Sequence, residues 1–439
     1  MSAEDFAVMA RLQPLNDELV EAARDIKVLS AIGWPAAMAD VFLDGLEKGN
    51  PRIPEPPPVD LEGAEIAERI PVLERLSRPV DDHPLARFIA RTAESYLLAA
   101  RLLRNAGTPT FTEISLELYG GPDDIVAPGG LTNIAAAEHL IEVTDDFADI
   151  CAEDAEDYCL LAATVQDEMA RTFAKDFHDP PLEVVVDESL SAKAAAGPDR
   201  IRLRAGTCFA PADIAQLTHH EAYVHSGTAR NGRRQPRLSC LGLGAPRTTA
   251  TQEGLATLAE LITTAIDLNR LRRLALRIKG TAVALDGGDF LDVFRVFLES
   301  GQTPRESYFS TSRVFRGGDP RGGACFTKDT VYLRGLLSTH TYFLTVLHER
   351  RIESLTQIFA GRMTWADVGE LAPFFESGVI EPPSIVPPWV TDRRRLAAWL
   401  AFNNLTHRLP METARLEDYI PRDHVPGTTT RWSRELRQD

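Results

Sequence analysis

The chain has 439 residues, of which 44% are hydrophobic, and its formal net charge is −17. This length exceeds one ordinary core, so we expect two lobes. The negative charge repels phosphate backbones and anionic lipid, which argues against a nucleic acid or a membrane surface as partner. No run approaches the roughly 18 apolar residues of a membrane span. The start, MSAEDFAVMARLQ, lacks the features of a signal peptide, so we expect a cytoplasmic protein.

The cysteines predict neither a disulfide framework nor a thiolate zinc finger. They are odd in number and show no CxxC spacing. We therefore expect reduced, mostly buried thiols at Cys151, Cys159, Cys208, Cys240 and Cys325.

The first 180 residues are predicted to form a mostly helical lobe. Apolar residues recur at helical spacing over about 18–47, and the proline-rich segment 51–60 is typical of an extended linker. A second helical pattern, LARFIARTAESYLLAARLL, ends near Gly107, and a third covers about 132–177.

The pattern changes at residue 181, where we place the start of a second lobe over residues 181–439. LEVVVD and IRLR are short β-branched runs separated by a polar loop, which predicts a small antiparallel sheet. Pro211 and Asp213 favour the start of the helix that contains HEAYVH, and a long helix is predicted from Thr251 to near Gly280. The predicted fold class is α+β and predominantly helical, with the small sheet beside the histidine-bearing helix.

His220, His225 and Glu253 form a candidate set of metal ligands. Catalytic zinc takes three nitrogen or oxygen ligands from the protein and keeps one position for water, so two histidines and a carboxylate are the expected set. Glu221 directly follows the first histidine and is predicted to take the proton of the attacking water as general base. Glu260 is either a competing third ligand or an acceptor for a histidine N–H.

The spacing of the two histidines requires a distorted helix. Five steps separate His220 from His225, and a regular α-helix would turn the second imidazole about 140° away from the first. A π-type turn restores the alignment, and such turns are common at functional sites. We therefore predict a π-bulge or an unwound turn between Ala222 and His225.

Two other histidines have simpler interpretations. His219 is not followed by a carboxylate, so it is expected at the surface or behind a ligand. His348 and Glu349 have no second histidine within a helical turn, so we expect them on a solvated helix face.

Several segments together resemble a known family. HEAYVH followed by TQEGLA resembles the bacterial flavohaemoglobin expression-modulating QEGLA motif proteins, relatives of the microtubule-associated tyrosine carboxypeptidases. LARFIARTAESYLLAARLL, LYGGPDD, RVFRGGDP and CFTKDTVYLRGLL extend this resemblance over most of residues 84–340. It implies a zincin-like peptidase with an HExxxH motif, in which His220, His225 and Glu253 hold zinc and Glu221 is the catalytic glutamate.

A carboxypeptidase also needs a cation for the C-terminal carboxylate of its peptide or protein substrate. The candidates are Arg313, Arg316 and Lys328, and Tyr332 is a candidate donor to the oxyanion. IRLRAG is the expected edge strand for an extended substrate. The basic segment Arg230–Arg237 either binds an acidic substrate tail or forms a solvated loop.

The leading hypothesis is a zinc peptidase of carboxypeptidase type with Glu221 as general base. The alternatives are an amidase that acts on a small peptide-like metabolite, and a regulatory protein whose metal site is structural or empty. The presence of Glu221 favours catalysis, because a structural site has no use for a base.

Overall fold

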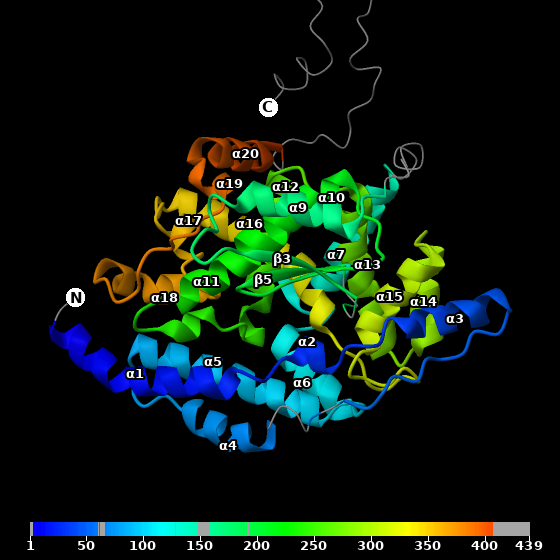
Figure 1. The fold of residues 1–439 in the computed structure, drawn as a ribbon, viewed down its shortest axis with the longest axis horizontal. Helices are drawn as coiled ribbons and strands as arrows, with labels where there is room; N and C mark the ends of the chain where they lie inside the picture. Colours follow the sequence, from blue (N-terminus) through cyan, green and yellow to red (C-terminus); the bar gives the residue numbers. More distant parts are fainter. Residues whose placement is uncertain are drawn as a thin grey trace, which may run out of the picture. The chain divides into compact units, whose positions relative to one another are not determined.

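Figure 1 shows the computed structural model, which describes residues 3–59, 61, 66–127, 129–147, 159–188, 190 and 193–406. The chain divides into two compact units, Met1–Thr391 and Asp392–Asp439. The described part of the second unit contains helix α20 (Arg393–Thr406). The predicted boundary near residue 180 lies inside the first unit. The division into these two units therefore does not test the lobes 1–180 and 181–439, which stay a prediction.

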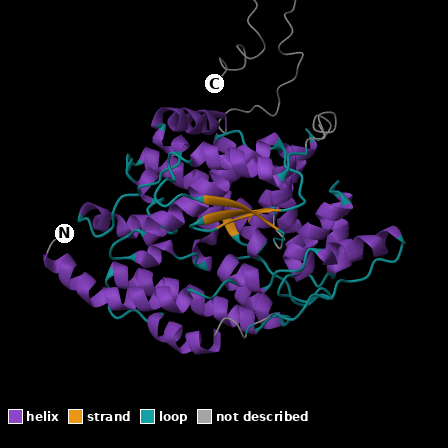
Figure 2. Cartoon of the chain, in the orientation of Figure 1, coloured by secondary structure: helices purple, strands orange, loops and turns teal. Residues whose placement is uncertain are grey.

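Helices dominate the first unit and the strands are few, as the predicted α+β class requires (Figure 2). The helices before the three-stranded sheet are α1 (Ala3–Ala23), α2 (Val28–Ala31), α3 (Ala37–Glu47), α4 (Ile66–Leu76), α5 (Pro84–Arg104), α6 (Pro109–Tyr119), α7 (Asn133–Asp145) and α9 (Ala162–Phe173). Those after it are α10 (Pro211–Leu217), η2 (Thr218–Ser226), α11 (Gly227–Arg233), η3 (Ser239–Gly242), η4 (Pro246–Thr248), α12 (Thr249–Ile262), α13 (Leu268–Leu285), α14 (Phe290–Glu299), α15 (Pro304–Phe315), η5 (Lys328–Thr330), α16 (Val331–His348), α17 (Ser354–Gln357), α18 (Trp365–Glu376) and α19 (Pro388–Thr391).

The N-terminal helical patterns are present but interrupted. The apolar pattern over 18–47 falls in α1, α2 and α3, and Pro35 lies in the break between α2 and α3, where one continuous helix would need a backbone N–H. Helix α5 begins at Pro84, in the first turn where proline is tolerated, and packs against α1 and α4 (Figure 1).

The three-stranded sheet differs from the predicted one. Strands β3 (Glu183–Asp187) and β5 (Arg200–Arg204) pair in parallel, and β4 (Ala194–Ala196) pairs with β5 in the antiparallel direction. The order is β3-β5-β4, because the loop between β3 and β5 contains a strand of its own. The predicted antiparallel pairing of LEVVVD with IRLR is therefore wrong. The predicted edge strand in IRLRAG is also wrong, because β5 is central and β4 lies at an edge. A two-stranded hairpin of β1 (Ile125–Ala127) and β2 (Leu131–Thr132) lies elsewhere in the unit.

The sheet is fixed to the histidine-bearing helix by a shared core. Residues alternate in burial along β5, so that Ile201 and Leu203 lie inside. They join a cluster with α9 and η2 that includes Val165, Met169, Phe173, Phe177, Phe209, Ala222 and Tyr223. This packing keeps β4 and β5 beside η2.

A disulfide joins Cys159 and Cys208, so the expectation of reduced thiols is wrong for this pair. Backbone hydrogen bonds in both directions between Leu160 and Phe209 bring the two cysteines together across 49 positions of the sequence. No local spacing reveals such a pair. Cys240 and Cys325 are free and buried as expected, and Cys151 lies outside the described residues.

The predicted long helix after Thr251 is two helices. Helix α12 ends at Ile262, and α13 begins after Asp267, whose side chain accepts from the N–H of Arg270 as an N-cap. The chain therefore turns where one helix was expected. By contrast, α10 begins at Pro211 as predicted. None of the helices in the described ranges is long and apolar enough to cross a membrane.

Candidate metal centre and substrate cleft

The segment with both histidines is a π-helix, η2, which confirms the predicted distortion. At its end the N–H of Gly227 donates to the carbonyl of Ala222, five residues back. The wider turn places the His220 and His225 rings 4.8 Å apart between centroids. A regular helix would separate these two imidazoles.

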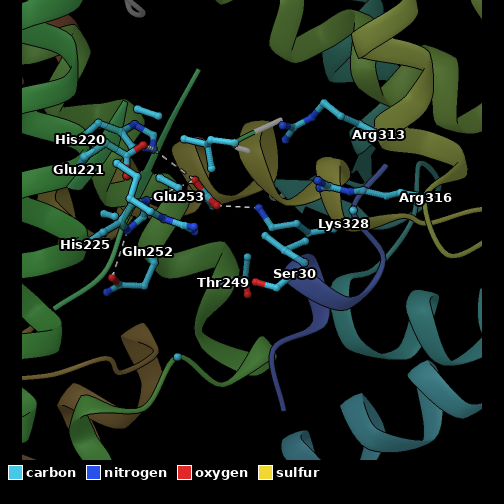
Figure 3. Close-up of a pocket in the computed structure, with 18 of the residues that line it drawn as sticks. Ser30, His220, Glu221, His225, Thr249, Gln252, Glu253, Arg313, Arg316 and Lys328 are labelled. Atoms are coloured by element: carbon cyan, nitrogen blue, oxygen red, sulfur yellow. Dashed lines mark hydrogen bonds and ion pairs between the residues drawn. The ribbon is translucent and has the colours of Figure 1, made fainter. Parts of the chain in front are cut away.

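A cavity of about 660 Å³ opens beside η2 (Figure 3). In this view His220, Glu221 and His225 lie on one side, Arg313, Arg316 and Lys328 lie on the other, and Glu253 lies between them. The lining also includes segments from β4, from the loop after α2 and from α12, represented by Ala194, Ala195, Ala196, Trp34, Pro35, Thr249 and Gln252.

A second cavity of about 640 Å³ adjoins the first. It shares His220, Glu221, Arg313, Arg316 and Tyr332 with it. His220, Arg313 and Arg316 therefore face open space on two sides, which gives a polymeric substrate room to pass.

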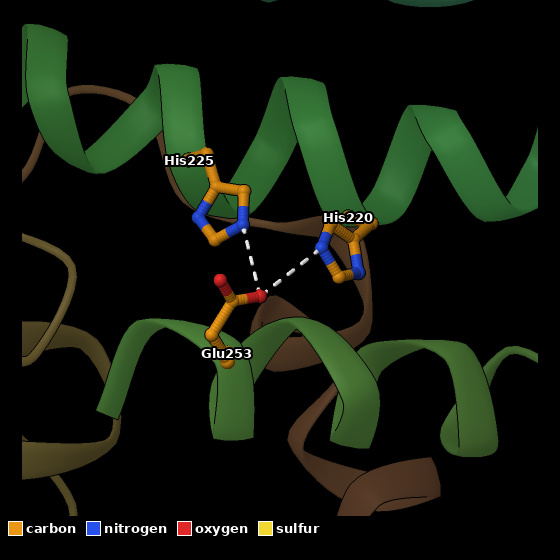
Figure 4. A group of neighbouring side chains, drawn as sticks. All are labelled: His220, His225 and Glu253. Carbon is orange, nitrogen blue, oxygen red and sulfur yellow. Dashed lines mark ion pairs between the residues drawn. The ribbon is translucent and has the colours of Figure 1, made fainter. Parts of the chain in front are cut away.

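The imidazoles and Glu253 converge on one point (Figure 4). Oε2 of Glu253 lies 3.5 Å from Nε2 of His220 and 3.6 Å from Nε2 of His225. One potential ligand atom from each residue falls within 4.8 Å of the other two. Oε2 of Glu253 is buried and has no hydrogen-bond partner. Burying an unpaired carboxylate oxygen costs free energy unless a cation binds to it. The three residues thus fit the donor set of zinc.

Glu260 contacts the far side of His220 from this point. Its Oε1 lies 2.6 Å from Nδ1 of His220 and accepts from Gln216 and Arg270. Burial alone would raise the pKa of Glu260, but Arg270 and His220 outweigh it and lower this pKa to about 2. Of the two interpretations, the geometry therefore favours an acceptor that orients His220 over a third ligand.

Two residues that the sequence did not single out hold His225. Oε1 of Gln252 lies 3.5 Å from Nδ1 of His225 and accepts a hydrogen bond from Thr228 at 2.9 Å. Arg362 donates to the backbone carbonyl of His225 at 3.2 Å. The position of Gln252 directly before Glu253 on α12 was an available signal, whereas Arg362 is remote in sequence.

Glu221, the predicted base, lines both cavities with a side chain that is 13% exposed. Its Oε1 lies 4.0 Å from Nε2 of His220. A carboxylate next to the converging ligand atoms, open to the cleft, is suitably placed to exchange a proton with a water there.

The two predicted arginines lie together but differ in their bonding. Arg313 donates to both oxygens of Asp329, at 2.5 and 2.7 Å. Arg316 lies 3.9 Å from the same carboxylate, and its Nε and Nη2 are buried without a hydrogen-bond partner. Arg277, which was not predicted, lies 3.6 Å from Asp329. Three guanidinium groups thus share one carboxylate, which leaves positive charge for a substrate anion.

The pKa values of this cluster follow from its charge. Burial would raise the pKa of Asp329, but Arg313, Arg277 and Arg316 hold it well below its ordinary value. Burial, helped by Arg313, lowers the pKa of Arg316 to about 10. An incoming carboxylate would relieve this excess of positive charge.

Lys328 and Tyr332 also lie at the cluster. Nζ of Lys328 donates to Oε1 of Glu253 at 2.7 Å and lies 3.4 Å from the hydroxyl of Tyr332. Tyr332 lines both cavities, whereas the lysine is engaged by a candidate metal ligand. The structure therefore brings all three predicted cations into the cleft, but Arg313 is engaged by Asp329 and Lys328 by Glu253.

Of the remaining sequence interpretations, some agree with the structure and some do not. His348 is exposed at the end of α16, as expected, whereas His219 is half-buried and stacks on Tyr223 outside the ligand cluster. The interpretation of Arg230–Arg237 as a solvated loop is wrong at its start. Arg230 lies in α11, is 4% exposed, and donates to carbonyls of the loops that flank β3 and β5, namely those of Pro180, Pro181 and Pro198.

Two histidines and a glutamate that converge beside a second, cleft-facing glutamate are typical of metal-dependent hydrolases. The family comparison agrees with this class. The model of the microtubule-associated tyrosine carboxypeptidase family matches residues 41–408, and the chain belongs to this family. The resemblance seen in HEAYVH and TQEGLA is thereby confirmed. No curated protein matches the chain. Family membership makes this protein a carboxypeptidase-like peptidase, a hydrolase whose substrate is the C-terminus of a peptide or protein.

Proposed function

We propose that this protein is a zinc-dependent carboxypeptidase in which His220, His225 and Glu253 hold the metal and Glu221 is the general base. The observation that supports it most is the buried, unpartnered Oε2 of Glu253, which faces Nε2 of both histidines. Zinc bound there supplies the Lewis acidity that activates water and polarises the scissile carbonyl.

Glu221 performs the proton transfers. Its carboxylate takes a proton from the attacking water and returns it to the leaving amine as the peptide bond breaks. The hydroxyl of Tyr332 donates to the oxyanion as the carbonyl carbon becomes tetrahedral. Two cations lie close to this ring, with Nζ of Lys328 4.9 Å and Cζ of Arg277 5.2 Å from its centroid.

Arg316 is the receptor for the substrate's C-terminal carboxylate. Its unpartnered donors and its planar fork suit a carboxylate, whereas Arg313 is already bound in both positions by Asp329. An extended substrate pairs with β4, because Ala194–Ala196 lines the cavity and its other side is paired with β5.

The test combines metal analysis with digestion of a peptide library by the wild type and Glu221→Gln. Each peptide is supplied with a free and an amidated C-terminus, and one set ends in tyrosine because the family description names that residue. We expect one zinc per chain in both proteins, and release of C-terminal residues from free peptides by the wild type alone.

Three results would contradict the proposal in different ways. Failure to bind zinc would refute the metal site. Cleavage of amidated and free peptides at equal rates would point to an amidase, because no terminal carboxylate would be recognised. Zinc without cleavage of any peptide would leave a regulatory binding protein.

A further inference from the structure

Lys328 contacts a candidate metal ligand and lies among buried side chains. Its ammonium donates to Oε1 of Glu253 at 2.7 Å, and the two side chains are only 7% and 10% exposed. A buried ion pair of this kind fixes the carboxylate in one orientation, because losing the contact would leave an unpaired charge.

The two oxygens of Glu253 consequently have separate environments. Oε1 is taken by Lys328, and Oε2 is without a hydrogen-bond partner and faces both histidines. We propose that Lys328 is a positioning residue for Glu253, which holds one carboxylate oxygen so that only the other is presented to the metal. This inference rests on the proposed zinc site, and it takes Lys328 out of the set of substrate-binding cations.

The backbone around Lys328 is suited to this task. The 3-10 helix η5 (Lys328–Thr330) is buried, and the preceding Thr327 donates its N–H to Ser115 at 2.9 Å. On the other side, Asn133 donates to the carbonyl of Thr330 at 2.9 Å. A segment held at both ends places the lysine reproducibly.

The neighbouring residue has the complementary function. Asp329 binds the arginine cluster through Arg313, while Lys328 binds Glu253. Two consecutive residues of opposite charge thus bind opposite sides of the cleft, Lys328 the candidate metal ligand Glu253 and Asp329 the arginine cluster. Arg316 keeps unpartnered donors for the carboxylate of a substrate. Lys328 is therefore not needed as a donor to that carboxylate.

The test is the visible absorption spectrum of the Co²⁺-loaded protein without substrate. The intensity of the Co²⁺ absorption bands depends on the ligands of the ion. This intensity falls as the coordination number rises. In Lys328→Met the freed Oε1 can also reach the metal, so we expect weaker, shifted bands. Arg316→Met is the matched control, because it removes a buried cation of the same cleft that does not touch Glu253. Its spectrum should equal that of the wild type.

The outcomes separate this inference from the proposed function. A wild type that binds neither Co²⁺ nor Zn²⁺ would refute the metal site itself. A wild type that binds Co²⁺, with Lys328→Met showing the same spectrum and only a raised KM, would make Lys328 a substrate ligand and overturn the inference. Circular dichroism checks that the variant is folded. If it is not, Lys328→Gln replaces it, because a shorter, neutral side chain cannot form the ion pair with Oε1 of Glu253, and an unchanged spectrum would again overturn the inference.

Discussion

Gly254 of α12 and Gly335 of α16 are in backbone contact. A Cβ atom on Gly254 would lie 2.2 Å from the carbonyl oxygen of Gly335, a distance that side chains do not tolerate. The two helices therefore approach as closely as their backbones allow. Glu253 directly precedes this contact, and Lys328 lies just before the start of α16. The glycine of the QEGLA motif thus sets the distance between α12, which supplies Glu253, and α16, which directly follows the 3-10 helix that supplies Lys328.

Replacing Gly254 with alanine should destabilise the fold. The added methyl group forces α12 away from α16, and overpacking of this kind costs about 1–3 kcal/mol. Urea denaturation measures the free energy of unfolding. The control is Gly369→Ala in α18, where an added Cβ meets nothing within 4 Å, and it should be neutral or stabilise by up to about 1 kcal/mol. Equal effects of both variants would show that the helix contact is unimportant.

Gln252→Met should weaken zinc binding. The methionine cannot accept the Nδ1–H of His225 or the hydroxyl of Thr228, and loss of a partner behind a metal ligand typically costs about 10–100-fold in affinity. Gln252→Glu keeps an acceptor oxygen and should retain most of the affinity. Isothermal titration with Zn²⁺ gives the constants.

A neighbouring variant controls for damage to α12. The hydroxyl of Thr251 is buried without a hydrogen-bond partner, so Thr251→Val should leave the zinc affinity unchanged. If Gln252→Met bound zinc as tightly as Thr251→Val, Gln252 would have no part in orienting His225.

The convergence of the candidate metal ligands could be predicted from the sequence because its signals are local. HEAYVH places His220, Glu221 and His225 on one short segment, and its spacing predicted a π-bulge or an unwound turn, of which η2 forms the π-type. Glu253 was chosen for its expected place at a helix start and for the resemblance of TQEGLA to the family motif. The helical character of the chain followed from periodicity in the same way.

Glu260 was expected either as a third ligand or as an acceptor for a histidine N–H, but the contacts of Lys328 and Arg362 with the cluster could not be predicted, because they are remote in sequence. Lys328 meets Glu253 across 75 positions, and nothing near Lys328 distinguishes a metal-ligand partner from a substrate receptor. The prediction that LEVVVD and IRLR pair in the antiparallel direction failed for a related reason, because β3 and β5 are parallel. Two short apolar runs predict strands, but the identity of their neighbour depends on whether the loop between them adds a third strand, as β4 does here.

Arg316→Met should reduce kcat/KM for peptides with a free C-terminus by about 10–100-fold, mainly through KM. Hydrogen bonds to a charged group contribute about 1.5–3 kcal/mol, and the methionine offers none. Peptides with an amidated C-terminus should be affected far less. Arg321→Met is the control, because Arg321 is 64% exposed and pairs with Glu55. A loss of equal size on both kinds of peptide would mean that Arg316 supports the fold of the cleft and does not bind the carboxylate.

Asp329→Asn should lower stability at neutral pH by about 3 kcal/mol, because it leaves three half-buried arginines without their shared, buried carboxylate. The pKa of Asp329 is lowered in the folded protein, from an ordinary value of 3.8. Its contribution is therefore complete above the unfolded-state pKa and is lost as the pH falls toward the folded-state pKa. The difference in unfolding free energy between wild type and variant should be constant from about pH 7 to about pH 5 and shrink below about pH 4.

Urea titrations at several pH values measure this difference, with Glu47→Gln at an exposed position as the control for loss of one negative charge. A difference that stayed constant down to pH 3 would mean that the asparagine disturbs packing, and that the ionised carboxylate does not stabilise the arginine cluster.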